Sequence, residues 1–247
     1  MRVPLGKQFR QLESTHIAFV ERQKIFFNAS AAADGRVNVS PRDGKSLRVL
    51  DANTVAYVDL TGSGNETAAH LLSNSRLTLM FCSFEGPPMI LRLYGRGRVV
   101  RRGSAEYASF VESRFEGQEI AGARQTVVLE IDLVQTSCGF NVPLFDYVGE
   151  RDTLLRWAEN KGGEGLEQYW REKNAFSIDG FATGLIEDPS SVDIPGGSLK
   201  ARPSGPDASG EPFGFGLELQ PQRAPQDTGS LTAACENHSA GNDAEPL

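Results

Sequence analysis

Short segments in which hydrophobic and polar residues alternate dominate this 247-residue chain. The clearest segment is 91–99, in which small or apolar residues alternate with Arg92, Tyr94, Arg96 and Arg98. Because successive side chains of a strand point to opposite faces of a sheet, this segment predicts a strand with one apolar face and one basic face. The same alternation, or a short apolar run, predicts further strands at 25–30, 36–40, 54–59, 76–82 and 126–134.

Helical periodicity is confined to fewer segments. Apolar residues recur at helical spacing over 9–24, further helical patterns follow at 104–115 and 151–173, and a short helix begins near Asn65. No strand–helix–strand alternation indicates a parallel sheet. About six strands with short links therefore predict a mainly β protein, in which an antiparallel barrel rather than a sandwich is flanked by helices.

Charge and turn-forming residues divide the chain at about residue 186. Residues 1–186 contain 22 Lys and Arg against 22 Asp and Glu, whereas residues 187–247 contain 3 against 10, so the whole net charge of −7 lies in the second part. That part also holds 8 of the 13 prolines, a composition that cannot bury enough surface to offset the entropy lost on folding. We therefore expect one folded domain over 1–186 and an acidic disordered tail over 187–247.

The composition also excludes several classes of function. A folded part without net positive charge does not favour nucleic-acid binding. The three cysteines and three histidines are scattered, without the spacing of a disulfide framework or a metal site. No segment approaches the ~20 apolar residues of a membrane span, and no apolar signal-peptide region begins the chain. We expect a cytoplasmic protein without a membrane partner and without a bound metal.

Two turns rich in glycine and hydroxyl residues follow predicted strands, at 38–48 and 61–67. Small residues let backbone N–H groups approach an anion, and the helix that begins near Asn65 directs its free N–H groups and positive dipole end toward the second turn. That turn lacks the third glycine of a dinucleotide fingerprint and the Gly-Lys-Ser of a P-loop. A Gly-X-Gly turn is also a common helix cap, so the pattern indicates a phosphorylated cofactor without identifying it.

Over residues 9–186 the order of these motifs resembles the pyridoxamine 5′-phosphate oxidase-like family of FMN-binding split-barrel proteins. The resemblance is carried by Phe26-Phe27, Asn38-Val-Ser-Pro41, Arg48-Val-Leu-Asp51, the turn from Asp59 to Thr67, His70-Leu-Leu72, Arg76 to Phe81, Leu91 to Gly95, Ser137-Cys-Gly139 and Val142-Pro143. It implies a six-stranded antiparallel split barrel that binds FMN. It further implies a homodimer, with the flavin at the dimer interface.

The resemblance also implies which residues hold the flavin. In the family, basic and hydroxyl residues on neighbouring strands and the first turn of the helix after the glycine-rich turn bind the flavin phosphate. Guanidinium groups suit this task because their paired donors can meet two phosphate oxygens. Carried over to this chain, the cofactor-binding residues are Ser40, Arg42, Arg48, Thr61, Gly62, Ser63, Gly64, Asn65 and Thr67.

Two departures from the family pattern bear on the reaction. Glu66-Thr67 stands where the authentic oxidase has an Arg-Lys pair, and no Arg-X-His follows Trp170. We therefore expect a flavin-dependent oxidoreductase that acts on an unidentified small molecule other than vitamin B6. An F420-type deazaflavin-dependent reductase and a non-catalytic flavin- or haem-binding protein are the alternatives. No residue is assigned as a catalytic nucleophile or base, because a flavin would carry the chemistry.

Overall fold

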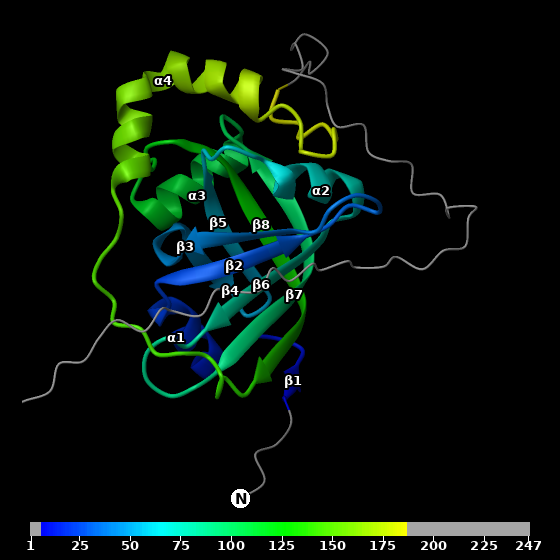
Figure 1. Cartoon of the computed structure of the whole chain (residues 1–247), viewed down its shortest axis with the longest axis vertical. Coiled ribbons are helices and arrows are strands. Elements are labelled where there is room, and N and C mark those ends of the chain that lie inside the picture. Colours follow the sequence, from blue (N-terminus) through cyan, green and yellow to red (C-terminus); the bar gives the residue numbers. More distant parts are fainter. Residues whose placement is uncertain (1–5, 187–247) are drawn as a thin grey trace, which may run out of the picture. The chain divides into compact units, whose positions relative to one another are not determined.

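The structure, a computed structural model, describes residues 6–186. These residues form an antiparallel β domain with flanking helices (Figure 1). Residues 187–247, for which the sequence predicts a disordered tail, lie outside the described residues. In chain order the elements are β1 (Gln8–Phe9), α1 (Ser14–Arg22), β2 (Ile25–Ser30), β3 (Asn38–Asp43), the 3-10 helix η1 (Gly44–Ser46), β4 (Leu47–Asp51), β5 (Thr54–Leu60), α2 (Glu66–Asn74), β6 (Arg76–Cys82), β7 (Ile90–Arg101), α3 (Ala105–Phe115), β8 (Ala123–Ser137) and α4 (Thr153–Lys173).

All strand pairs are antiparallel, and the sheet runs in the order β3-β2-β6-β7-β8-β5-β4, with β1 beside β8. The edge strands β3 and β4 follow each other in the chain through η1, so the sheet curls into the split barrel that the sequence predicts. The sheet has eight strands rather than six. The sequence pattern missed β1, which is only two residues long, and β4, which overlaps a segment interpreted as a turn.

The two longest strands, β7 and β8, pair along the middle of the sheet. Arg96 lies opposite Glu130 in their register, which is one of the cross-strand charge pairings that the alternation predicts. The register shifts between Tyr94 and Gly95, and a Cβ on Gly95 would collide with the carbonyl oxygen of Glu130. Only glycine therefore allows the strands to approach so closely at this irregularity.

The interior of the barrel is filled by apolar side chains. The Phe26 ring meets the Tyr57 ring edge-on at a centroid distance of 5.3 Å and stacks on the Phe81 ring at 5.7 Å. On the outer face, α3 covers β5, β7 and β8 through a second apolar cluster that includes Ala56 and Tyr107. The interior cluster further contains Leu12, Phe19, Val20, Leu47, Val55, Leu71, Leu77, Leu79, Leu91, Leu93, Val127, Leu129, Ile131 and Val134.

At one end of the barrel the buried positions become polar. Alternate residues of β2, namely Phe26, Asn28 and Ser30, are buried, so this strand is apolar inside at its start and polar inside at its end. The second half of α4 runs across this end toward α2, whereas α1 lies at the other end (Figure 1). α4 bends at Gly162, whose φ of 66° is a conformation that residues with a Cβ rarely adopt.

Candidate functional site

A network of buried charges occupies the polar end of the barrel. Arg124 Nε donates to Asp59 Oδ2 at 2.9 Å, and Gln125 Nε2 donates to the same oxygen at 2.7 Å. Arg42 Nη1 lies 2.7 Å from Asp59 Oδ1, as an ion pair without the alignment of a hydrogen bond. Asp59 and Arg124 are fully buried. Two guanidinium groups therefore share one carboxylate inside the protein.

A β-bulge explains how two consecutive residues reach Asp59. Asp59 lies opposite Gln125, but Leu60 lies opposite Ala123, so Arg124 is an extra residue in β8. Because of this extra residue, the side chains of Arg124 and Gln125 both turn inward. Burial by itself raises the pKa of the Asp59 carboxyl, but the two guanidinium groups outweigh burial and hold this pKa below its usual range.

A second polar set connects β2, β3 and α2. The Thr67 hydroxyl accepts hydrogen bonds from Asn28 Nδ2 at 2.7 Å and from Asn38 Nδ2 at 3.2 Å. The Ser40 hydroxyl donates to Asn38 Oδ1 at 3.0 Å, and Arg42 Nε donates to Asn28 Oδ1 at 3.1 Å. The predicted site residues Ser40, Arg42 and Thr67 therefore meet through two asparagines, and Arg42 joins this set to the buried charge network.

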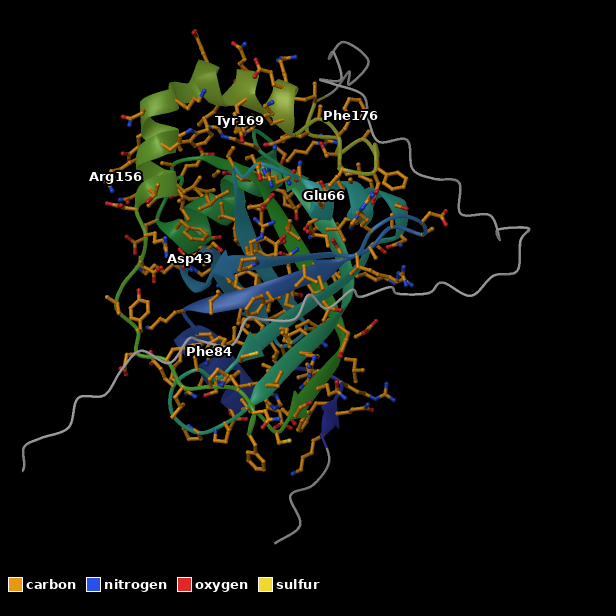
Figure 2. The ribbon with its side chains drawn as sticks, viewed as in Figure 1. Asp43, Glu66, Phe84, Arg156, Tyr169 and Phe176 are labelled. Carbon is orange, nitrogen blue, oxygen red and sulfur yellow. The ribbon has the colours of Figure 1, made fainter. Side chains whose placement is uncertain are left out.

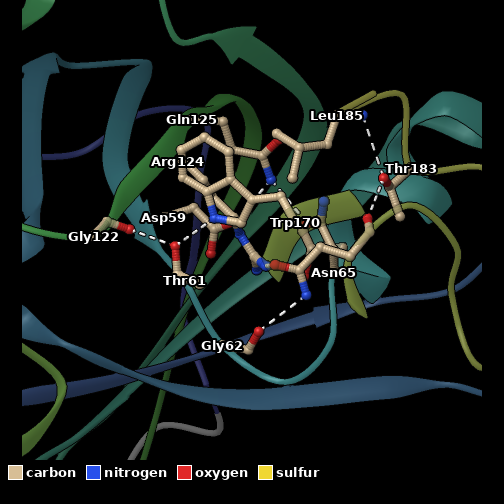
Figure 3. Close-up of polar contacts among 12 residues, drawn as sticks. Asp59, Thr61, Gly62, Asn65, Gly122, Arg124, Gln125, Trp170, Thr183 and Leu185 are labelled. Carbon is tan, nitrogen blue, oxygen red and sulfur yellow. Dashed lines mark hydrogen bonds and ion pairs between the residues drawn. The ribbon is translucent and has the colours of Figure 1, made fainter. Parts of the chain in front are cut away.

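The glycine-rich loop between β5 and α2 lies beside the charge network and contacts the end of α4 (Figure 3). Trp170 Nε1 donates to Thr61 Oγ1 at 2.8 Å, and Thr61 Oγ1 donates to the carbonyl oxygen of Gly122 at 2.8 Å. Just after α4, Asn174 Nδ2 donates to the carbonyl oxygen of Gly62 at 3.0 Å. The end of α4 therefore fixes the conformation of the loop that the sequence predicts to bind phosphate.

The N-terminus of α2 presents donors that no described group uses. Within residues 6–186, the backbone N–H groups of residues 63–68 have no hydrogen-bond partner. The loop and the helix border a cavity of about 530 Å³. Figure 2 shows Glu66 and Phe176, which both line it, at this end of the barrel. Other residues that line the cavity are Asn38, Ser63, Gly64, His70 and Lys173.

Glu66 brings a negative charge to this cavity. Both oxygens of its carboxylate accept a hydrogen bond from the backbone N–H of Ile178, at 3.0 and 3.1 Å. Burial raises the pKa of the Glu66 carboxyl, while the Ile178 N–H and the nearby His70 act in the opposite direction. The carboxylate is thus engaged by the segment that follows α4, and it does not occupy the free N–H groups at the start of its own helix.

Arg48 lies apart from the other predicted site residues. Its guanidinium group donates to three backbone carbonyl oxygens, including that of Arg114, and lies 4.0 Å from the centroid of the Phe115 ring. Arg48 is paired with Ala56, on the face of the sheet that α3 covers. Within one chain, Arg48 therefore does not meet Arg42 or the glycine-rich loop.

Several residues of this site were not predicted from the sequence. Asn28 and Asp59 interrupt otherwise apolar strands at inward positions, and this interruption is a signal that could have identified both. Arg124 and Gln125 carry no such signal, because only the bulge turns both inward. The sequence pattern assigns no role to His70, although this residue is buried and lines the cavity.

A family model described as pyridoxamine 5′-phosphate oxidase matches residues 12–138, which is more than half of the 247 residues. The chain belongs to the pyridoxamine 5′-phosphate oxidase family. The matched residues run from just before α1 to the end of β8. They include the charge network at Asp59, the glycine-rich loop and α2, whereas α4 and its contacts to the loop lie beyond the match.

The chain is also similar to individual proteins. The chain is 41% identical over 175 residues to the pyridoxamine 5′-phosphate oxidase family protein ustO of Aspergillus flavus, covering 64% of this chain and 70% of that protein. A solved structure of a putative pyridoxamine 5′-phosphate oxidase from Lactobacillus delbrueckii is 20% identical, with a TM-score of 0.40, covering 51% of this chain and 94% of the other. The haem storage protein HutZ of Vibrio cholerae is 19% identical, with a TM-score of 0.36, covering 50% and 93%.

The chemistry available at the cavity is anion binding. Free backbone N–H groups at a helix N-terminus, the Ser63 hydroxyl and the Lys173 ammonium are donors that suit the phosphate of the flavin that the family implies. In the described part of the chain, no three His, Cys, Asp or Glu side chains are grouped to hold a metal ion. No described helix is long and apolar enough to cross a membrane.

Proposed function

We propose that this protein binds FMN at the α2 end of the barrel and acts as a flavin-dependent oxidoreductase on a small molecule. The observation that carries the proposal is the run of unused N–H groups at residues 63–68, a run that borders the cavity through Ser63, Gly64 and Glu66. Membership of the pyridoxamine 5′-phosphate oxidase family supports the choice of FMN among phosphorylated ligands. The surrounding contacts also support it, because the carboxylate of Glu66, which lines the cavity, accepts from the Ile178 N–H, and the nearby Asp179 pairs with Arg36.

The chain's own residues would bind and orient the cofactor. The α2 N–H groups and Lys173 would hold the phosphate, and the contacts from Trp170 and Asn174 would keep the loop in the conformation that exposes these groups. When bound, a flavin supplies electron transfer by its ring system. No side chain of the described residues is assigned a role in proton transfer to the substrate.

A homodimer is part of this proposal. Asn38 and Ser40 on the edge strand β3 point inward, while Val37 and Val39 next to them are 71% and 61% exposed. An exposed apolar row on an edge strand favours contact with another chain. Because β3 also supplies Asn38 to the cavity, a second copy that packs on this edge would lie close to the flavin.

Fluorescence titration of the flavin-free full-length protein with FMN tests the proposal. We expect one flavin per chain, with riboflavin bound at least tenfold more weakly because charge-assisted hydrogen bonds to the phosphate contribute ~1.5–3 kcal/mol. Reduction of the bound flavin by a reduced nicotinamide cofactor would support the proposal that the protein is an oxidoreductase. Binding without any turnover would favour a carrier, and binding of F420 or haem in preference to FMN would overturn the proposal.

A further inference from the structure

His70, which lines the cavity at the N-terminus of α2, has a ring nitrogen without a partner among the described residues. The residue lies one helical turn after Glu66, and its side chain is only 1% exposed. Its Nδ1 lies 3.1 Å from the Ser30 hydroxyl oxygen, whereas its Nε2 has no hydrogen-bond partner among the described residues. The ring nevertheless lines the cavity. One nitrogen of His70 is thus paired inside the protein, and the other is a buried polar atom without a partner in a residue that lines the cavity.

A buried polar atom without a partner is unusual in a folded protein. Such an atom loses its hydrogen bonds to water without gaining a replacement, so buried polar groups are nearly always paired. The Nδ1 atom is satisfied by the Ser30 hydroxyl, and the side chain is almost fully buried. A ligand in the cavity that forms a hydrogen bond with His70 Nε2 would remove this cost, and it is the simplest explanation for an unpaired nitrogen at this place.

The groups around His70 indicate an anionic ligand. Lys173 has no ion-pair partner among residues 6–186, and Ser63 adds a hydroxyl donor. The acidic Glu66 accepts from the Ile178 N–H, and no metal-binding group of side chains lies in this part of the chain. These features favour a phosphomonoester over a cation.

We infer that His70 binds the phosphate of the ligand in this cavity, with Nε2–H donating to a phosphate oxygen. If the Ser30 hydroxyl donates to Nδ1, the ring proton is on Nε2, so Ser30 acts as a positioning residue that sets the tautomer. His70 then supplies a side-chain donor on the helix in which Glu66-Thr67 replaces the family's basic pair. The assignment of FMN as the source of the phosphate rests on the proposed function.

The test combines a phosphate titration with a pair of variants. In the full-length wild-type protein, ¹⁵N NMR of the imidazole groups is recorded while inorganic phosphate is added, and the His70 signal is identified by its loss in His70→Phe. FMN and riboflavin affinities are then measured for the wild type, for His70→Phe, and for His70→Gln, which restores an N–H donor. His16→Gln, on α1 at the other end of the barrel, is the control (Figure 1).

We expect phosphate to shift the Nε2 resonance of His70 and leave that of His16 unchanged. His70→Phe should weaken FMN binding at least tenfold without changing riboflavin binding, and His70→Gln should recover part of the loss. A shift with phosphate but no binding of FMN would support the role of His70 and contradict the flavin assignment. An unshifted His70 resonance, together with equal FMN affinities in all variants, would overturn the inference while leaving the proposed function in place.

Discussion

Arg124 and Asp59 form an ion pair, 2.9 Å between Nε and Oδ2, in which both side chains are fully buried. Arg42 adds a second cation to the same carboxylate at 2.7 Å. Buried charges are tolerated when they are paired and hydrogen-bonded, because desolvation is otherwise too costly. The pair therefore fixes the bulged end of β8 beside the loop that the proposed site uses.

Replacing Asp59 by Asn should destabilise the protein strongly. The amide keeps the shape but removes the charge, which leaves two buried guanidinium groups without compensation, at an expected cost of about 3–5 kcal/mol. The free energy of unfolding by urea measures this loss. The exposed pair of Arg98 and Glu106 provides the control, since Glu106→Gln should change stability by less than ~1 kcal/mol.

The Asp59→Asn substitution should also alter the pH dependence of stability. The pKa of Asp59 is lowered in the folded state, so its stabilising contribution is complete above the unfolded value of ~3.9 and is lost as the pH falls through the folded value. The difference in unfolding free energy between wild type and Asp59→Asn should therefore be constant near neutral pH and shrink below about pH 4. A difference that does not shrink in acid would show that the carboxylate charge is not what Asp59 contributes.

Replacing Glu66 by Gln should strengthen FMN binding. The substitution removes a negative charge beside the proposed phosphate site, while the amide oxygen can still accept from the Ile178 N–H. Repulsion across a partly buried site is on the order of 1 kcal/mol, so we expect a threefold to tenfold gain in affinity by titration calorimetry. Glu21→Gln, on α1, should have no effect. Weaker FMN binding by Glu66→Gln would place the phosphate elsewhere.

Arg48→Ala distinguishes a phosphate site built by one chain from a shared one. Arg48 is occupied by backbone carbonyl groups and by the Phe115 ring, away from the cavity. We therefore expect the FMN affinity of Arg48→Ala to stay within about twofold of wild type. A tenfold loss without unfolding would instead mean that Arg48 reaches a flavin held partly by a second chain.

The sequence predicted the fold better than it predicted the site. Alternation located the long strands and the antiparallel barrel, because the period of two is strong wherever one face is buried. It did not locate β4, whose five residues include Arg48 within a turn-like segment. Ser40, Arg42 and Thr67 come together as one set, yet the bulge at Arg124 depends on pairing between strands distant in sequence. A local pattern cannot report such pairing.

We also predict that the FMN-loaded protein does not oxidise pyridoxamine 5′-phosphate. Glu66-Thr67 replaces the basic pair of the authentic oxidase, and the residues after Trp170 are Arg171, Glu172 and Lys173 rather than Arg-X-His. A poorly oriented substrate over a flavin can cost on the order of 100-fold in rate. Oxygen consumption measures the reaction, and a kcat/KM of ~10⁴ M⁻¹s⁻¹ or above would restore the activity after which the family is named.

Whether the N-terminus of α2 holds the flavin phosphate is tested most directly by a crystal structure of the full-length protein with FMN. We expect phosphate oxygens within hydrogen-bond distance of the backbone N–H groups between Ser63 and Ala68, with Lys173 beside them and Glu66 still turned to Ile178. Electron density for FMN at another place on the chain, with these N–H groups bound only to water, would show that the N-terminus of α2 is not the phosphate site.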